Sequence, residues 1–97
     1  MRYEFHPDAL EEYNDAGSYF AQKEAGLDLR FIVAVEDAIE RILQHPDRYR
    51  RFEEDVRRCL TRVFPYAVLY TIEKDYILIV AVAHCSKEPG YWKHRLS

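Results

Sequence analysis

The chain has 97 residues, of which 48% are hydrophobic and 14% aromatic. This is the size and composition of one packed domain, residues 1–97, and it excludes intrinsic disorder. There is no run of about 18 apolar residues and no apolar signal segment after Met1, so we expect a cytoplasmic protein without a membrane partner.

The net charge of −3 conceals an asymmetry along the chain. Residues 1–47 carry 11 Asp and Glu against 4 Lys and Arg, whereas residues 48–97 carry 6 against 10. The first half is therefore acidic and the second half basic. We expect an anionic partner to dock on the second half.

The N-terminal half predicts a short strand followed by two helices. Residues 2–5 alternate polar and aromatic side chains, which is typical of a strand. Pro7 and the acidic residues after it favour a helix start, and we predict a helix over residues 7–24. Its apolar face consists of Leu10, Tyr13, Gly17 and Phe20.

A second helix is predicted to begin near Leu27 and to end at His45-Pro46. Its apolar stripe consists of Phe31, Ile32, Val35, Ile39, Ile42 and Leu43. Gly26 is a good stop for the first helix, so only about two residues join the two. Such a short connection makes the helices an antiparallel hairpin.

The C-terminal half predicts a sheet. Residues 47–55 show no period and carry many charges, so we predict a surface loop there. Strands are predicted over residues 56–64, 66–72 and 76–83, with turns short enough to make the pairing antiparallel. The last strand is apolar on both faces, which favours a central position. We therefore predict an α+β fold in which the helical hairpin covers one face of a three- to four-stranded antiparallel sheet.

Arginines interrupt the first of these C-terminal strands. With a period of two residues, Arg58 and Arg62 share one face and stand about 13 Å apart. This spacing suits two contacts to an extended polyanion or to acidic side chains of a partner. Alternatively, the charges protect an edge strand from aggregation.

His84 ends the last strand, where it could exchange a proton at neutral pH. RNA cleavage without a metal needs a base, an acid and cations, and His84 and Tyr91 with Arg58, Arg62 and Arg95 could supply them. Alternatively, His84 is a structural hydrogen-bonding residue. We expect these side chains to gather on the uncovered side of the sheet.

No cofactor or metal ion is expected. Cys59 and Cys85 lie far apart without CxxC spacing, so neither a disulfide framework nor a zinc site is predicted. His84 and Cys85 are neighbours on a strand, and their side chains would point to opposite faces. His94 follows nearby, but the three residues lack the spacing of a metal site.

Several of these features, in this order, resemble the RelE/ParE superfamily of bacterial toxins. They are the strand and the long hairpin ending in His-Pro, the arginine-rich strand running into Phe64-Pro65-Tyr66, Tyr70, Ala81-Val82-Ala83-His84, Pro89, Tyr91-Trp92 and Arg95. The resemblance spans essentially the whole chain. It implies the toxin of a type II toxin-antitoxin (plasmid stabilisation) system, neutralised by a cognate antitoxin.

The resemblance leaves three functions open. ParE-like toxins inhibit DNA gyrase by binding it, and the long hairpin and the lack of lysines on the arginine-rich strand favour this branch. RelE-like toxins cleave mRNA on the ribosome, which would make this chain a metal-independent endoribonuclease that uses Arg58, Arg62, His84, Tyr91 and Arg95. The third possibility is a degenerate member that only binds its antitoxin.

Overall fold

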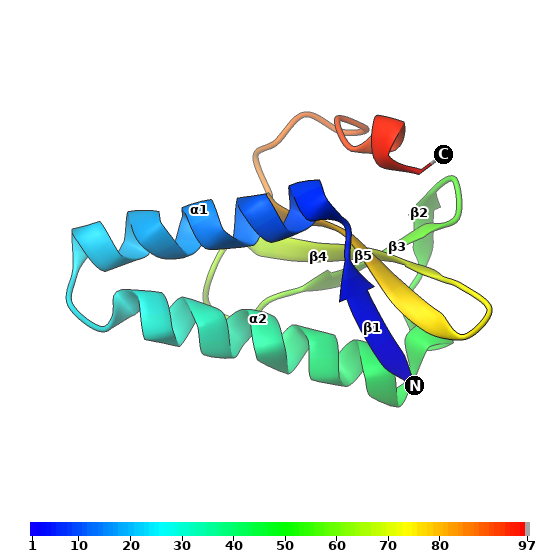
Figure 1. The fold of residues 1–97 in the computed structure, drawn as a ribbon, viewed down its shortest axis with the longest axis horizontal. Coiled ribbons are helices and arrows are strands. Elements are labelled where there is room, and N and C mark those ends of the chain that lie inside the picture. Colours follow the sequence, from blue (N-terminus) through cyan, green and yellow to red (C-terminus); the bar gives the residue numbers. More distant parts are fainter. Residues whose placement is uncertain (97) are drawn as a thin grey trace.

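The computed structural model describes residues 1–96, in which a helical hairpin lies beside a twisted sheet (Figure 1). The helices are α1 (Pro7–Lys23) and α2 (Leu27–Gln44), with the short 3-10 helices η1 (Pro46–Arg48) and η2 (Lys93–Arg95). The strands are β1 (Arg2–Phe5), β2 (Arg51–Glu53), β3 (Val56–Leu60), β4 (Tyr66–Ile72) and β5 (Tyr76–His84). Within residues 1–96, no helix combines the length and the apolar character needed to cross a membrane.

The strands form one sheet in the order β1-β5-β4-β3-β2. The predicted α+β fold is confirmed, but the sheet has five strands, and β1 pairs with β5 in parallel. Residues 51–53, predicted to be loop, pair with β3 as the edge strand β2. Edge strands are commonly charged, so the charges that suggested a loop are compatible with β2. The pattern of a four-residue strand such as β1 does not reveal its neighbour or its direction.

Both helices lie where the sequence predicts them. Pro7 occupies the first turn of α1, and the His6 side chain caps that turn by accepting a hydrogen bond from the Asp8 N–H at 3.1 Å. Gly26 has a φ of 86° and precedes α2. A backbone in this left-handed region favours glycine, which explains the sharp reversal between the antiparallel helices.

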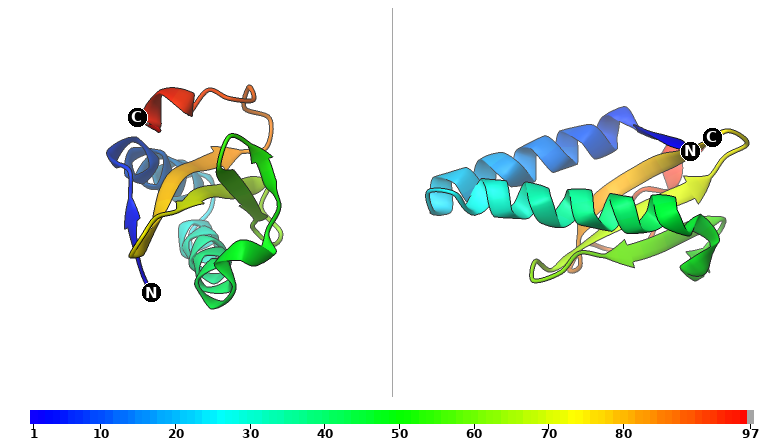
Figure 2. Two further views of the ribbon diagram at one scale, coloured as in Figure 1. Left: turned by 90° about the vertical axis from the view of Figure 1, so that its right-hand side faces the viewer. Right: turned by 90° about the horizontal axis from the view of Figure 1, so that it is seen from below.

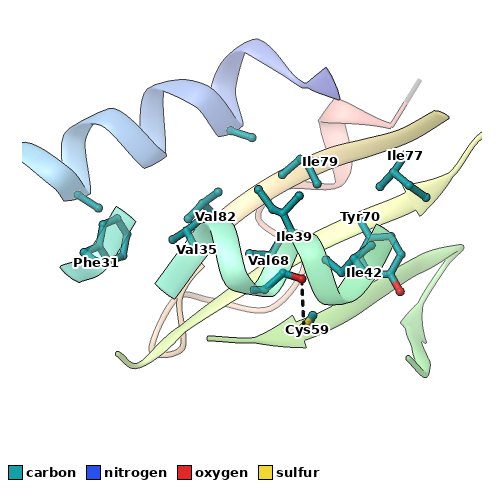
Figure 3. Packing of buried hydrophobic residues seen from close by; sticks show 13 residues of the cluster. Phe31, Val35, Ile39, Ile42, Cys59, Val68, Tyr70, Ile77, Ile79 and Val82 are labelled. Atoms are coloured by element: carbon teal, nitrogen blue, oxygen red, sulfur yellow. Dashed lines mark hydrogen bonds between the residues drawn. The ribbon is translucent and has the colours of Figure 1, made fainter. Parts of the chain in front are cut away.

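One face of the sheet packs against the hairpin (Figure 3). Its buried residues come from α1, α2, β3, β4 and β5, and include Ala9, Phe31, Val35, Ile39, Ile42, Cys59, Val68, Tyr70, Ile77, Ile79 and Val82. We call this the helix-side core. Partly buried aromatic rings surround it, among them Phe20, Phe64 and Tyr66, whose centroids lie 4.9–6.0 Å from neighbouring rings. This core fixes the hairpin on the sheet.

The C-terminal segment, residues 85–96, covers part of the opposite face and reaches the start of α1 (Figure 2). We call it the tail. Trp92 is only 2% exposed and packs in a second, smaller cluster with Val56, Ala67, Leu69, Val80, Ala81 and Ala83. The tail thus packs on the side of the sheet that the helices leave uncovered.

Candidate functional site

Arg58 and His84 line the same small pocket beneath the tail, with a volume of about 130 Å³. We call it the tail pocket. Lys87 adds an ammonium group and Glu88 a carboxylate to its lining, while Phe52, Tyr91 and Trp92 contribute aromatic rings. The pocket therefore combines positive charge with aromatic surface, a combination suited to an acidic or aromatic group of a partner.

Arg58 is exposed on the tail side of β3. Its guanidinium carbon lies 5.3 Å from the centre of the Phe52 ring, and Phe52 in turn packs edge-on against Trp92 at 5.8 Å. Within residues 1–96, Arg58 makes no ion pair. Its charge is thus positioned by aromatic rings and available to a partner.

His84 is exposed at the end of β5, and its ring packs edge-on against Tyr66 with centroids 5.2 Å apart. Its Nδ1 accepts a hydrogen bond from the Ser86 N–H at 3.0 Å and lies 2.7 Å from Ser86 Oγ. Because Nδ1 is an acceptor, a neutral ring carries its proton on Nε2. His84 is therefore oriented by its own loop.

Tyr91 and Arg95 are held by Glu12 of α1. Glu12 Oε1 lies 2.9 Å from Arg95 Nη1, and Glu12 Oε2 lies 3.2 Å from Arg95 Nη2. The Tyr91 hydroxyl also donates to Glu12 Oε2. The Arg95 side chain is only 7% exposed. We call these three side chains the Glu12 network.

The Glu12 network also completes the edge of β5. β1 ends at Phe5, opposite Ile79, and the chain then leaves the sheet to enter α1. Beyond that point, the Val82 N–H donates to Glu12 Oε1 at 3.1 Å, and the Val80 carbonyl accepts from Arg95 Nη1 at 2.9 Å. Side chains thus replace the missing strand, which gives Glu12 and Arg95 a structural role.

The Tyr91 hydroxyl is also unsuited to give up its proton. Burial, and then its hydrogen bond to the Glu12 carboxylate, raise the pKa of Tyr91 well above the ordinary value of 10.0. A general acid works best with a pKa near the operating pH. Tyr91 is therefore better suited to anchoring the tail than to proton transfer.

Arg62 lies away from the tail pocket. The strand predicted over residues 56–64 ends at Leu60, so the alternation that placed Arg58 and Arg62 on one face breaks before Arg62. Arg62 Nη1 lies 3.6 Å from Asp37 Oδ2 on α2, on the helix side of the sheet. The predicted pair of arginines is thus split between two surfaces.

The turn after β3 carries a feature that the sequence did not reveal. It lines a groove of about 520 Å³ against α2, which we call the Val63 groove. Its lining consists of Leu29, Arg30, Val33, Ala34 and Asp37 from α2, and of Arg62, Val63 and Phe64 from the turn.

Glu12 was likewise missed as a site residue, because its sequence position indicated only a favourable charge near a helix start.

The residues considered for metal binding do not come together. Within residues 1–96, no group of three or more His, Cys, Asp or Glu side chains is arranged to hold a metal ion. Cys59 is buried and Cys85 is exposed. His94 lies near the start of α1, with Nε2 3.6 Å from Asp8 Oδ2.

Comparisons with known proteins agree with the fold. The family profile described as "ParE toxin of type II toxin-antitoxin system, parDE" matches residues 3–89. Among solved structures, the chain is similar to one from the chromosomal ParDE TA system of P. aeruginosa, with a TM-score of 0.73 and 11% sequence identity. The superposition covers 87% of this chain and 95% of that one. No curated protein sequence matches the chain significantly.

Proposed function

The chain belongs to the ParE toxin family of type II toxin-antitoxin systems, and on that basis we propose that it inhibits growth in the cytoplasm by binding a protein target such as DNA gyrase. The observation that favours binding over RNA cleavage is the Glu12 network. It occupies Tyr91 and Arg95, and Arg62 lies on another surface. Arg58, His84 and Tyr91 line one pocket, but the Tyr91 hydroxyl is held by Glu12.

The proposed contact with the target is the tail pocket. Arg58 presents an unpaired guanidinium beside Phe52, and arginine next to aromatic rings is typical of residues that dominate protein interfaces. A cognate antitoxin would neutralise the toxin, as the family membership implies, and the pair would serve plasmid stabilisation.

The proposal is tested by adding the purified chain to a supercoiling assay with purified gyrase. We expect inhibition, and we expect Arg58→Ala to weaken it about tenfold or more, since truncation of an interface hot spot costs at least about 1.4 kcal/mol. Arg50→Ala is the matched control, because Arg50 is exposed and outside the tail pocket. Supercoiling that proceeds unchanged in the presence of the wild-type chain would rule out gyrase as the target.

Ribosome-dependent cleavage of mRNA is the second candidate, because His84 and Arg58 share a pocket. In that case, His84→Ala and Arg58→Ala would each abolish cleavage in a purified translation system while antitoxin binding stays measurable. Mapping RNA ends in cells after induction separates the two functions. Cuts phased with the ribosome would support the enzyme, and their absence together with growth arrest supports the inhibitor. A degenerate toxin would cause neither effect and would only bind its antitoxin.

A further inference from the structure

The sheet itself gives the tail pocket an apolar floor. Ala67 on β4 lies directly opposite Ala83 on β5 in the register, and Leu69, two residues along β4, points to the same face. An alanine side chain ends at Cβ, so two opposed alanines leave a hollow where larger side chains would meet. The three floor residues are only 3–7% exposed. The floor therefore offers a ligand apolar surface in a confined space.

The size of the pocket limits what can enter it. Its volume of about 130 Å³ equals that of roughly four water molecules in the liquid. One aliphatic side chain fills such a space, whereas an entire helix does not. The tail forms one wall through Pro89, Tyr91 and Trp92, and Glu12 holds the Tyr91 hydroxyl. The pocket is thus preformed for a single side chain of a partner.

The polar groups of the tail pocket form its rim. Arg58, His84 and Lys87 line the pocket but are exposed, unlike the floor. Arg58 and Lys87 make no ion pair within residues 1–96. Because the Ser86 N–H donates to His84 Nδ1, a neutral His84 ring offers its Nε2–H as a donor. Glu88 is the one carboxylate in the lining. The rim has more donors and positive charge than it can satisfy itself, which favours an anionic ligand group.

A protein carboxylate suits this rim better than a nucleic-acid backbone. Proteins hold a phosphate backbone with several cationic side chains spaced along it. Near the tail pocket, Lys93 is already paired with Glu53, with Nζ and Oε1 2.8 Å apart. Arg95 is held by Glu12, and Glu88 would repel neighbouring phosphates. A backbone phosphate also leaves the apolar floor unused, whereas a peptide can place an apolar side chain beside an acidic one.

We infer that the tail pocket binds a short segment of the target protein in which an apolar side chain stands next to an aspartate or a glutamate. The apolar side chain fills the hollow over Ala67 and Ala83, and the carboxylate accepts hydrogen bonds from Arg58 and His84. This inference rests on the proposed function in taking the tail pocket as the contact with the target, and it adds the chemistry that the pocket selects. A partner with only one of the two groups leaves either the hollow or the donors unused, which makes the pocket selective.

The first experiment tests the pocket without gyrase. Capped dipeptides are titrated into the purified, isotope-labelled chain, and NMR follows the backbone amides of Ala67, Ala83 and His84. We expect leucyl-aspartate to shift these signals. Leucyl-asparagine, which lacks only the charge, should bind about tenfold more weakly because a charge-assisted hydrogen bond is lost. Inorganic phosphate should leave the amides of the two alanines unshifted.

Three results of this titration would overturn the inference. They are equal affinities of the two dipeptides, no shift at the three amides with leucyl-aspartate, and phosphate shifts as large as those of the dipeptide. The last result would make the pocket a phosphate site instead.

Two variants separate the floor from the rim. Ala83→Leu fills the hollow and Arg58→Glu reverses the charge at the rim. Each should abolish the shifts caused by leucyl-aspartate and weaken the inhibition of gyrase about tenfold or more. Ala21→Leu is the matched control, because Ala21 is exposed on α1 and lies outside the tail pocket. Arg58→Glu changes an exposed residue, so it keeps the test decisive if Ala83→Leu lowers the melting temperature.

The two experiments also separate this inference from the proposed function. If the wild type binds leucyl-aspartate but does not inhibit gyrase, the proposed target is wrong and the selectivity of the pocket stands. If the wild type inhibits gyrase and both variants inhibit it equally well, the inference is overturned while gyrase remains the target.

Discussion

The two faces of the sheet are closed by different means. On the helix side, α1 and α2 bury a continuous apolar core that includes Phe31, Val35 and Ile42, each 0% exposed. On the tail side, a short segment without an α-helix is fixed by one buried indole, Trp92, and by the Glu12 network. The first arrangement spreads its stabilisation over many contacts, and the second concentrates it in a few.

This difference separates the residues that stabilise the fold from the residues that could act on a partner. The residues of the helix-side core are buried, whereas the tail brings charged and aromatic residues to the surface and is attached to β5 and α1. The residues that fasten the tail, Tyr91 and Arg95, are the ones that a nuclease would need free. On the tail side, two potential catalytic residues therefore hold the tail in place, and the pocket that the tail forms is lined by Arg58 and His84.

The largest expected effect comes from deleting one large side chain on each face. Truncation of a buried aromatic residue costs about 3–5 kcal/mol. We expect Trp92→Ala to lower the opening free energy of the tail by this amount, so that amide exchange rises in residues 85–96 and in the strands beneath them. Phe31→Ala should lower the stability of the whole domain by a similar amount. Hydrogen exchange monitored residue by residue distinguishes the local loss from the global one.

If Trp92→Ala instead accelerates exchange in α1 and α2 as much as in the tail, the two faces unfold as one unit. The two faces would then differ in their packing but not in their local stability.

A slightly smaller effect is expected from Glu12→Ala. It removes the carboxylate closest to the buried Arg95 guanidinium, and breaking such a pair typically costs about 3 kcal/mol. Asp8 remains, with Oδ2 3.6 Å from Arg95 Nε, but the Val82 N–H loses its acceptor. Urea unfolding measures the loss. Glu11→Ala, one residue away on an exposed face of the same helix, should change stability by less than about 0.5 kcal/mol.

Replacing both partners sharpens this test. Glu12→Leu combined with Arg95→Met should recover part of the loss, because an apolar pair of similar size avoids the cost of burying charge. A double variant as unstable as Glu12→Ala would mean that the hydrogen bonds to the Val80 carbonyl and the Val82 N–H dominate the Glu12 network.

The helix-side core could be predicted from the sequence because it follows simple periods. The stripe of Phe31, Val35, Ile39 and Ile42 defined α2, and the apolar run of residues 76–83 defined β5, an interior strand of the sheet. The direction of β1 and the presence of β2 could not be predicted in this way. Short strands carry too few residues to specify a partner, and pairing depends on contacts far apart in the sequence.

The candidate site was predictable only in part. The sequence indicated Arg58, His84 and Tyr91, which do line one pocket, although Glu12 holds the Tyr91 hydroxyl. It placed Arg62 with them because a strand that ends at Leu60 cannot be told from one that continues to residue 64 by alternation alone. The ion pair of Glu12 with Arg95 joins residues 83 positions apart, and no local pattern reports such a contact. The positive φ of Val63 was equally hidden, since valine is not a residue expected there.

The smallest expected effect compares one tyrosine from each face at alkaline pH. Burial raises the pKa of both Tyr70, in the helix-side core, and Tyr91, in the tail, well above 10.0. The unfolded chain releases these protons near pH 10 while the folded chain keeps them. Stability is therefore unaffected well below pH 10 and falls above it, by up to about 1.4 kcal/mol per pH unit for each tyrosine.

Tyr70→Phe should reduce this slope in the unfolding of the whole domain, whereas Tyr91→Phe should reduce it in the opening of the tail. Urea unfolding between pH 9 and pH 11 measures the slope for the whole domain, and amide exchange over the same range measures the slope for the tail. If Tyr91→Phe leaves the slope for the tail unchanged, Tyr91 is not buried against Glu12.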